Sequence, residues 1–224
     1  MLQAGDWAFV FGNFDYLLAG AGITVGLTLT SLLLGFLAGF PAGALEVYGD
    51  GILERVVSTS GVILRGTPIV VIMLVLFFVV SISQSAFVTA TVGLGLRSAA
   101  YQSQIFRGAL QSVDEGQMEA ARSVGLSRFE SIRYVVVPQA LRRSMPGFQN
   151  EFTIVLKDTS IAFAIGLAEL LTRGNDLFTQ SGRSTAVLEV FLTISAIYFV
   201  LTFATNRGLD RLSDYYAIPS GDSA

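Results

Sequence analysis

The sequence contains no histidine and no cysteine among its 224 residues, and Lys157 is its single lysine. Without those side chains the chain cannot build the usual zinc site, a Ser-His-Asp or Cys-His nucleophile, or a disulfide. No G-x-x-x-x-G-K-[ST] loop precedes Lys157, so the chain cannot hold ATP in that way. These absences count against a membrane metalloenzyme or an intramembrane protease. Any ATP-driven work must come from a partner.

Charge is also scarce, because only 14% of the residues are charged and 52% are hydrophobic. The mean hydropathy is +0.63. Residues 16–45 form a run of 30 without a formal charge, and residues 69–96 form a run of 28. Both runs exceed the roughly 20 residues that cross a bilayer as a helix. The sequence therefore predicts an all-α, polytopic membrane protein.

We predict five transmembrane helices, at residues 16–45, 68–85, 86–105, 141–171 and 186–206. The fourth contains Glu151, Lys157, Asp158 and Glu169, and a helix with those charges cannot face lipid. It is expected to line a cavity or to face a partner. Adjacent Lys157 and Asp158 point about 100° apart on a helix, so we also expect a break near Thr159.

The basic residues indicate the orientation, because cytoplasmic loops carry the excess of lysine and arginine. With the N-terminus outside and the C-terminus inside, ten arginines are cytoplasmic and only Arg173 and Arg183 are external. This gives an external segment (1–15), a transmembrane domain (16–212) and a cytoplasmic tail (213–224). Residues 1–15 lack the basic start of a signal peptide, so the first run is expected to remain as a span. Arginine outnumbers lysine 13 to 1 in an acidic chain, which is typical of high-GC genomes or saline surroundings.

The long polar loop at residues 109–138 predicts a helical hairpin. Asp114 begins one short helix, and Gly125 stands where a left-handed C-terminal cap belongs. Ser127 and Glu130 have capping-box spacing and begin a second helix, which Pro138 is expected to interrupt. From periodicity alone, the hairpin is either an amphipathic connector on the membrane surface or a docking element. Membrane spans on both sides argue against binding of nucleic acid.

The spacing in this loop is that of a known motif. Glu119-Ala120-Ala121, Gly125, Val135, Val137 and Pro138 resemble the E-A-A-x3-G-x9-I-x-L-P loop of prokaryotic ABC importer permeases. Further segments resemble the polar amino acid permeases of the histidine, glutamine and arginine type. These are residues 65–68, 99–101, 105–108, 138–143, 150–152 and 157–160.

The resemblance implies a permease subunit of an ATP-driven importer in the prokaryotic cell membrane. It further implies a second permease subunit, identical or a sister chain, an extracytoplasmic substrate-binding protein and a dimer of ATP-binding cassette ATPases. ATP and magnesium would bind those ATPases, and this chain would hold no cofactor or metal and catalyse nothing. The ATPase-coupling residues would be Glu119, Ala120, Ala121, Gly125 and Pro138. Glu119 either pairs with an ATPase arginine or caps its own loop, and the two alanines permit close docking.

Two departures from the family pattern concern charge in the third span. Gln104 stands where the family commonly has glutamate, and Arg97 stands where a small or amide residue is more usual. Charged groups at bilayer depth are functional candidates, so we expect the substrate pathway to include Arg97, Glu151, Lys157, Asp158 and Thr159. Arg97 would bind a substrate carboxylate, and Asp158 or Glu151 the ammonium. The alternative is an Arg97–carboxylate pair that only joins two helices.

Other functions stay open at this stage. The permease could carry another small solute, such as an opine or a sulfur compound. A channel or carrier that works without an ATPase is the alternative from a different class, and the coupling-loop spacing counts against it. The glycine pairs Gly22-x-x-x-Gly26 and Gly35-x-x-x-Gly39 in the first span predict close helix packing.

Overall fold

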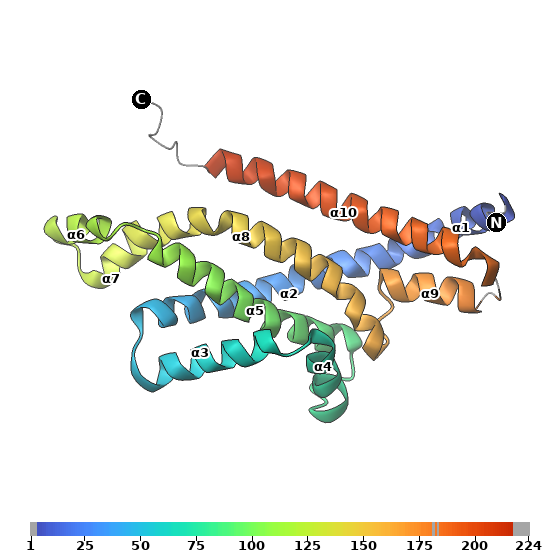
Figure 1. The fold of residues 1–224 in the computed structure, drawn as a ribbon, viewed down its shortest axis with the longest axis horizontal. Helices are drawn as coiled ribbons and strands as arrows, with labels where there is room; N and C mark the ends of the chain where they lie inside the picture. Colours follow the sequence, from blue (N-terminus) through green and yellow to red (C-terminus); the bar gives the residue numbers. More distant parts are fainter. Residues whose placement is uncertain (1–3, 181, 183, 217–224) are drawn as a thin grey trace.

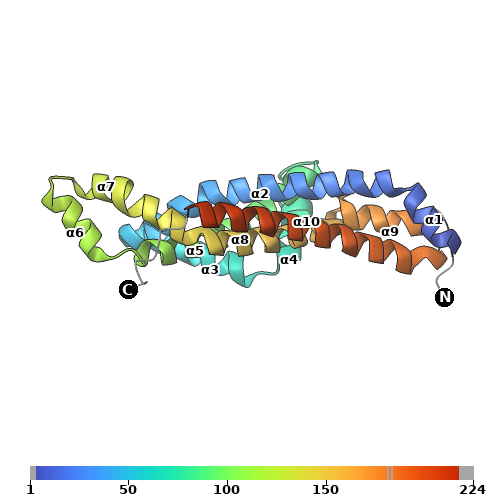
Figure 2. The ribbon, with the colours of Figure 1, turned by 90° about the horizontal axis from the view of Figure 1, so that it is seen from above.

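Four long helices form the body of the molecule and run along its long axis (Figures 1 and 2). The computed structural model describes residues 4–180, 182 and 184–216, and every regular element in that part of the chain is helical, as predicted. The long helices are α2 (Phe14–Tyr48), α5 (Ala86–Gln111), α8 (Val137–Asp158) and α10 (Val187–Tyr216). The short helices α1 (Ala4–Gly12) and η4 (Ser184–Ala186) lie near the start of α10.

Helix α2 has 35 residues, so at about 1.5 Å per residue it extends beyond the roughly 30 Å of bilayer hydrocarbon. It lies against α5 along much of its length. A Cβ at Gly35 would lie 2.5 Å from the Gln102 amide nitrogen, and one at Gly39 would lie 2.7 Å from the Ala99 carbonyl oxygen. The predicted packing role of Gly35 and Gly39 is therefore confirmed. It is wrong for Gly22 and Gly26, which have no atom within 4 Å of an added Cβ.

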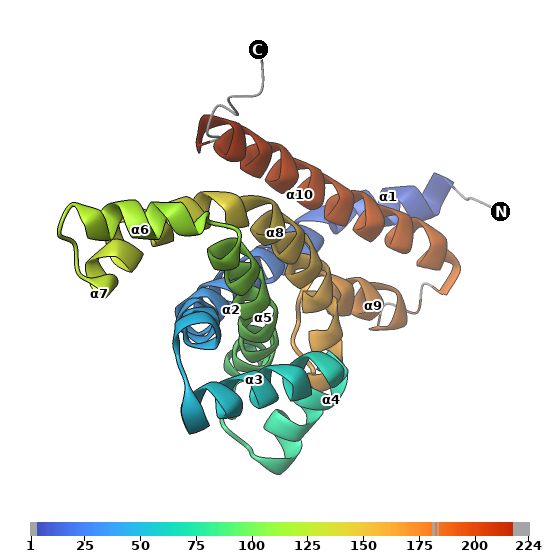
Figure 3. The ribbon, with the colours of Figure 1, turned by 60° about the vertical axis from the view of Figure 1, so that its left-hand side comes forward.

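The predicted second span, residues 68–85, is wrong in its bounds. The structure has a helix before it, α3 (Gly51–Gly66), and then only α4 (Ile69–Leu74) with the π-helical turn η1 (Val75–Val79). The two parts meet at an angle of 106°. Pro68 causes the break, because its backbone is extended (ψ 135°) and its ring cannot continue a helix. Figure 3 shows α3 and α4 on one side of the long helices.

The predicted fourth span, residues 141–171, is not one helix. Helix α8 ends at Asp158, the 3-10 helix η3 (Thr159–Ile165) follows, and α9 (Leu170–Gln180) is a separate helix. The expected break near Thr159 is thus confirmed. Gly166 ends η3 with a positive φ of 74°, a conformation that residues with a Cβ rarely adopt.

The number of membrane spans can be judged from helix length and apolarity. In the part of the chain that the structure describes, two helices satisfy both, α2 and residues 187–212 of α10. A third span results if α3 and α4–η1 count as one broken crossing. Helices α5 and α8 carry too many polar side chains to qualify alone. Five spans and the N-out orientation therefore stay predictions.

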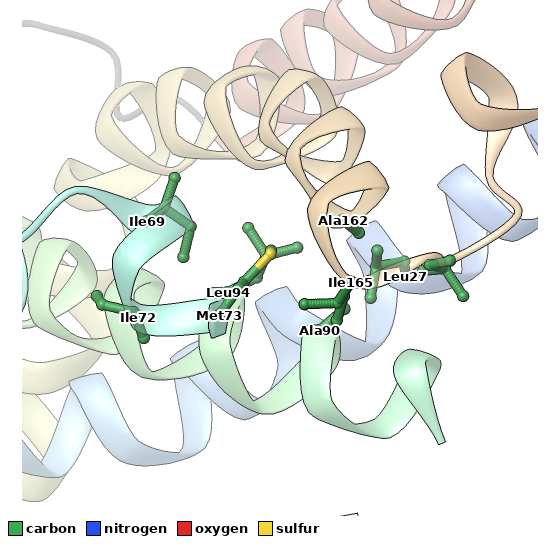
Figure 4. Packing of buried hydrophobic residues seen from close by; sticks show 9 residues of the cluster. Leu27, Ile69, Ile72, Met73, Ala90, Leu94, Ala162 and Ile165 are labelled. Carbon is green, nitrogen blue, oxygen red and sulfur yellow. The ribbon is translucent and has the colours of Figure 1, made fainter. Parts of the chain in front are cut away.

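One apolar cluster joins the break regions to the long helices. Met73 from α4, Leu94 from α5 and Leu27 from α2 are each no more than 1% exposed, and they meet Ala162 of η3 (Figure 4). In a membrane such side chains stabilise the fold through close van der Waals packing, because lipid is as apolar as the core and transfer from it adds little. The cluster fixes α4 and η3 beside each other, and thereby fixes the end of α8 relative to α5.

Candidate functional site

The predicted hairpin projects from one end of the helix bundle (Figures 1 and 3). It consists of α6 (Glu115–Ser123), α7 (Arg128–Ser131) and the π-helical turn η2 (Ile132–Val136). Asp114 caps α6, since its carboxylate accepts the Gly116 N–H at 2.8 Å. The predicted helix start is confirmed.

The turn between the two helices is fixed by hydrogen bonds at both ends. Gly125 has a φ of +95° and its N–H donates to the Arg122 carbonyl at 3.0 Å. The Leu126 N–H donates to the Ala121 carbonyl at 3.2 Å, which completes a Schellman motif. The Ser127 hydroxyl accepts the Glu130 N–H, and the Glu130 carboxylate accepts the Ser127 N–H at 2.8 Å. The predicted glycine cap and capping box are both confirmed.

The capping box also sets the charge state of Glu130. Its carboxylate receives a hydrogen bond from Ser127, and this lowers the pKa of Glu130 below its ordinary value. A charged carboxylate at this helix start is also favoured by the helix dipole.

Pro138 does not interrupt the second helix, and that prediction is wrong. In η2 the Val137 N–H reaches back five residues to the Ile132 carbonyl, and α8 continues from there through Pro138. Proline is tolerated because it directly follows the π-helical turn, where the regular i→i−4 bonding pattern is already interrupted. The hairpin is therefore continuous with the charged helix α8.

The predicted coupling residues divide between two faces of α6. Glu119 and Ala120 are exposed, whereas Ala121 is 6% exposed and packs inward. Glu119 does not cap the helix, since Asp114 has that position. Instead Glu119 lines a groove of about 520 Å³ together with Asp114, Glu115 and Arg128. The exposed face of α6 therefore presents the Ala120 methyl group beside the carboxylates of Glu115 and Glu119.

The second predicted group lies in the middle of the bundle, where α5 meets the end of α8. Arg97 forms an ion pair with Asp158, and the two side chains are 20% and 22% exposed. The Arg97 guanidinium also lies over the Tyr101 ring, 5.1 Å from its centroid. This pair, 61 residues apart in sequence, is thus held between two helices but reaches the surface of the chain.

Glu151 lies two turns before Asp158 on α8 and is 3% exposed. Its carboxylate accepts the Ser98 hydroxyl at 2.7 Å, and the Gln102 side-chain amide donates to Ser98 at 3.0 Å and to the Leu32 carbonyl at 3.2 Å. A chain of polar contacts therefore crosses from α2 through α5 to α8. Sequence reasoning missed Ser98, Tyr101 and Gln102. Their spacing of four from each other or from Arg97 was the available signal.

The remaining predicted residues stand apart from this group. Lys157 is exposed and makes no ion pair with a described residue. Thr159 is fully buried and donates its hydroxyl to the Leu156 carbonyl at 2.7 Å, within the end of α8. Glu169, the other charge noted in this region, is buried and accepts the N–H groups of Leu171 and Thr172 at the start of α9.

The arrangement offers charge complementarity. Among the residues that the structure describes, no three carboxylates come together as a metal site. Arg97 and Asp158 present one positive and one negative group side by side. That is the charge pattern needed to bind a zwitterion.

Comparisons with known proteins agree on one family. The protein-family model described as "Binding-protein-dependent transport system inner membrane component" matches residues 31–213 of this chain. The glutamine transport system permease protein GlnP of Escherichia coli K12 is 34% identical over 212 residues, 92% of this chain and 95% of that protein. The nopaline transport system permease protein NocM of Agrobacterium fabrum is 31% identical over 96% and 92% of the two chains. A solved structure described as an amino acid ABC transporter with histidines has a TM-score of 0.85, with 28% identity, over 96% of this chain and all of that one.

Proposed function

The chain belongs to the family of binding-protein-dependent transport system inner membrane components, and from this membership we propose that it carries a polar amino acid through the cell membrane. It acts as the permease subunit of an ATP-driven importer. A second permease subunit, a dimer of ATP-binding cassette ATPases and an extracytoplasmic binding protein complete the assembly. ATP and magnesium bind the ATPases, and this chain supplies the pathway by alternating access.

The observation that carries the proposal is the capped hairpin at the end of the bundle. Caps at Asp114, Gly125 and Ser127 hold its two helices as one body, and η2 joins that body to α8 without a flexible linker. A displacement of the hairpin at exposed Glu119 and Ala120 is therefore transmitted to α8, the helix that bears Asp158. This is the property that coupling to an ATPase requires.

Arg97 and Asp158 are the proposed contacts for the substrate backbone. An α-amino acid presents a carboxylate and an ammonium, so it can replace the Arg97–Asp158 pair with two ion pairs, Arg97 with its carboxylate and Asp158 with its ammonium. Glu151 remains bonded to Ser98 in the wall of the site and stays available for the ammonium. Lys157 and Thr159 stay in the proposal on the sequence prediction alone, because Lys157 makes no ion pair with a described residue and Thr159 bonds within the end of α8.

The first experiment measures ATP hydrolysis by the reconstituted complex with its binding protein and, in turn, each of the twenty amino acids and an opine. A parallel assay measures uptake by the chain reconstituted without the ATPases. Stimulation by a polar amino acid is expected. Gly125→Pro should abolish it, because proline cannot adopt a φ of +95° and has no N–H for Arg122. Val124→Ala, at a side chain 80% exposed, is the matched control and should leave stimulation intact.

The outcomes separate the rival functions. Transport by this chain without any ATPase would establish a channel or carrier. Stimulation only by an opine would make that solute the substrate, an alternative that the similarity to a nopaline permease supports.

The role of Arg97 is tested with Arg97→Gln in the assembled transporter. Loss of one charged hydrogen-bonded contact, worth roughly 1.5–3 kcal/mol, should weaken apparent substrate affinity about ten- to hundredfold. The variant Arg173→Gln, at an arginine on α9, is the control with unchanged affinity. Unchanged affinity and intact transport in Arg97→Gln would leave Arg97 as a helix-joining residue only.

A further inference from the structure

A buried carboxylate near the end of α2 is not used by the proposed substrate site. The Glu46 side chain is 1% exposed. One of its oxygens accepts the Gln104 side-chain amide at 2.7 Å and lies 3.3 Å from the Arg107 guanidinium. Its other oxygen has no hydrogen-bond partner among the described residues. Burial of such a charge is costly, so its partners and position must explain it.

Glu46 continues the face on which α2 touches α5. A Cβ at Gly39 would lie 2.7 Å from the Ala99 carbonyl oxygen, and one at Gly43 would lie 2.6 Å from the Ser103 carbonyl oxygen. The two backbones are thus in contact up to the turn that bears Glu46, which lies three residues after Gly43. At that point the glycine contacts end, and a carboxylate held by two side chains of α5 takes their place.

The position of this contact relates it to the hairpin. Helix α5 ends at Gln111, one turn after Arg107, and α6 begins at Glu115. Movement of the hairpin therefore acts on the end of α5 that Glu46 holds. Among the described residues, the bonds of Glu46 to Gln104 and Arg107 are the polar contacts that join this end of α5 to α2.

The residue type at position 104 bears on why the carboxylate lies on α2. In the polar amino acid permeases that the sequence resembles, glutamate commonly stands at this position. Here the carboxylate lies across the helix interface on α2, and the amide of Gln104 donates to it.

We propose that Glu46 is a positioning residue that locks the hairpin-side ends of α2 and α5 together, so that both helices follow the hairpin as one unit. It supplies from α2 the carboxylate that Gln104 does not provide on α5. The role of Glu46 in transport rests on the proposed function. Its role in holding α2 and α5 together does not.

The test exchanges the two side chains. Glu46→Gln should lower the substrate transported per ATP hydrolysed about tenfold in the reconstituted complex, within the usual range for coupled neighbours. Glu46→Gln combined with Gln104→Glu restores a carboxylate, now on α5, that faces both the new amide on α2 and Arg107. This double variant should return the ratio to near its original value. Gln104→Glu alone places two carboxylates together, so this variant should also transport less substrate per ATP hydrolysed than the parent.

A second measurement is independent of transport. Because the chain has no cysteine, spin labels can be attached at Ile52→Cys and Val124→Cys, both 80% exposed in the original residues. Glu46→Gln should broaden the distance distribution between the labels, and the exchanged pair should narrow it again. If broadening and rescue occur in a complex that transports no amino acid, the lock stands and the proposed function fails. A narrow distribution and an unchanged transport ratio in Glu46→Gln, or failure of the exchanged pair to restore either, would overturn the proposal.

Discussion

Single glycines decide how closely α2 approaches α5. A methyl group at position 43 would lie 2.6 Å from the Ser103 carbonyl oxygen, a backbone atom that moves only if α5 moves. We expect Gly43→Ala to destabilise the folded protein by about 1–3 kcal/mol. Gly22→Ala, in the same helix with no atom within 4 Å, should be neutral or stabilising by up to about 1 kcal/mol. Equal melting temperatures of the two purified variants in one detergent would contradict this.

Single residues of the candidate site also differ in how well they could be predicted from the sequence. Arg97, Glu151 and Asp158 were predictable because ionised groups at membrane depth are costly and few. Ser98 and Gln102 were not, because neutral polar residues are common in such helices and only the packing against Gly35 shows which of them meet. Glu46 escapes sequence reasoning for a simpler reason. It follows the first uncharged run directly, so hydropathy places it in the loop beyond that run.

At the scale of the element, the hairpin should respond to acid through its cap. The pKa of Glu130 lies below its ordinary value of 4.5 because of its bonds with Ser127. The resulting stabilisation is complete above the ordinary value and is lost as pH falls through the lowered pKa. A spin label at Val124→Cys should therefore become more mobile below about pH 4.

Two variants test that response. Glu130→Ala has no side-chain acceptor for the Ser127 N–H, so it should be more mobile than the parent at neutral pH and should change little with acid. Ser127→Ala removes the cap from the other side, at a cost of about 1 kcal/mol, and should raise mobility at every pH. A parent hairpin whose mobility is the same at pH 7 and pH 3.5 would refute the assignment of the cap to Glu130.

Elements with local signals were predictable, and elements set by distant contacts were not. The caps of α6 and α7 depend on residues within four positions, so their pattern could be read directly. Helix α3 lacks such a pattern, and its place beside α5 depends on the 106° bend at Pro68. The prediction that Pro138 ends the second helix was wrong for a related reason. No local pattern in the sequence distinguishes the π-helical turn η2 from a helix end at Pro138.

At the scale of the whole molecule, the orientation in the membrane is open to direct test. A cysteine placed at Gln180, at the end of α9, should react with an impermeant maleimide in intact cells. A cysteine at Val124 in the hairpin should react only after the membrane is opened. The parent chain has no cysteine and is the blank. Reaction of the hairpin site in intact cells would reverse the predicted orientation.

Composition and family membership answer different questions at this scale. The low charge content predicted an all-helical membrane protein, and the motif predicted the family that the comparisons confirm. The excess of arginine over lysine still indicates only a high-GC genome or saline surroundings. Relatives of similar identity are named for glutamine and for nopaline, so overall identity to this chain does not fix the substrate.

The π-helical turn η2 has an evolutionary consequence. Such a turn holds one residue more than an α-helical turn, so a single deletion between residues 132 and 136 can be absorbed by converting it to regular α-helix. The shortened turn would close nearly the same angle, so Glu119 and Ala120 would keep their present direction relative to α8. A single-residue deletion in the regular α-helical part of α8 would instead rotate the hairpin by about 100° relative to the rest of that helix. Natural variants should therefore lose a residue from η2 more readily than from the α-helical turns that follow it.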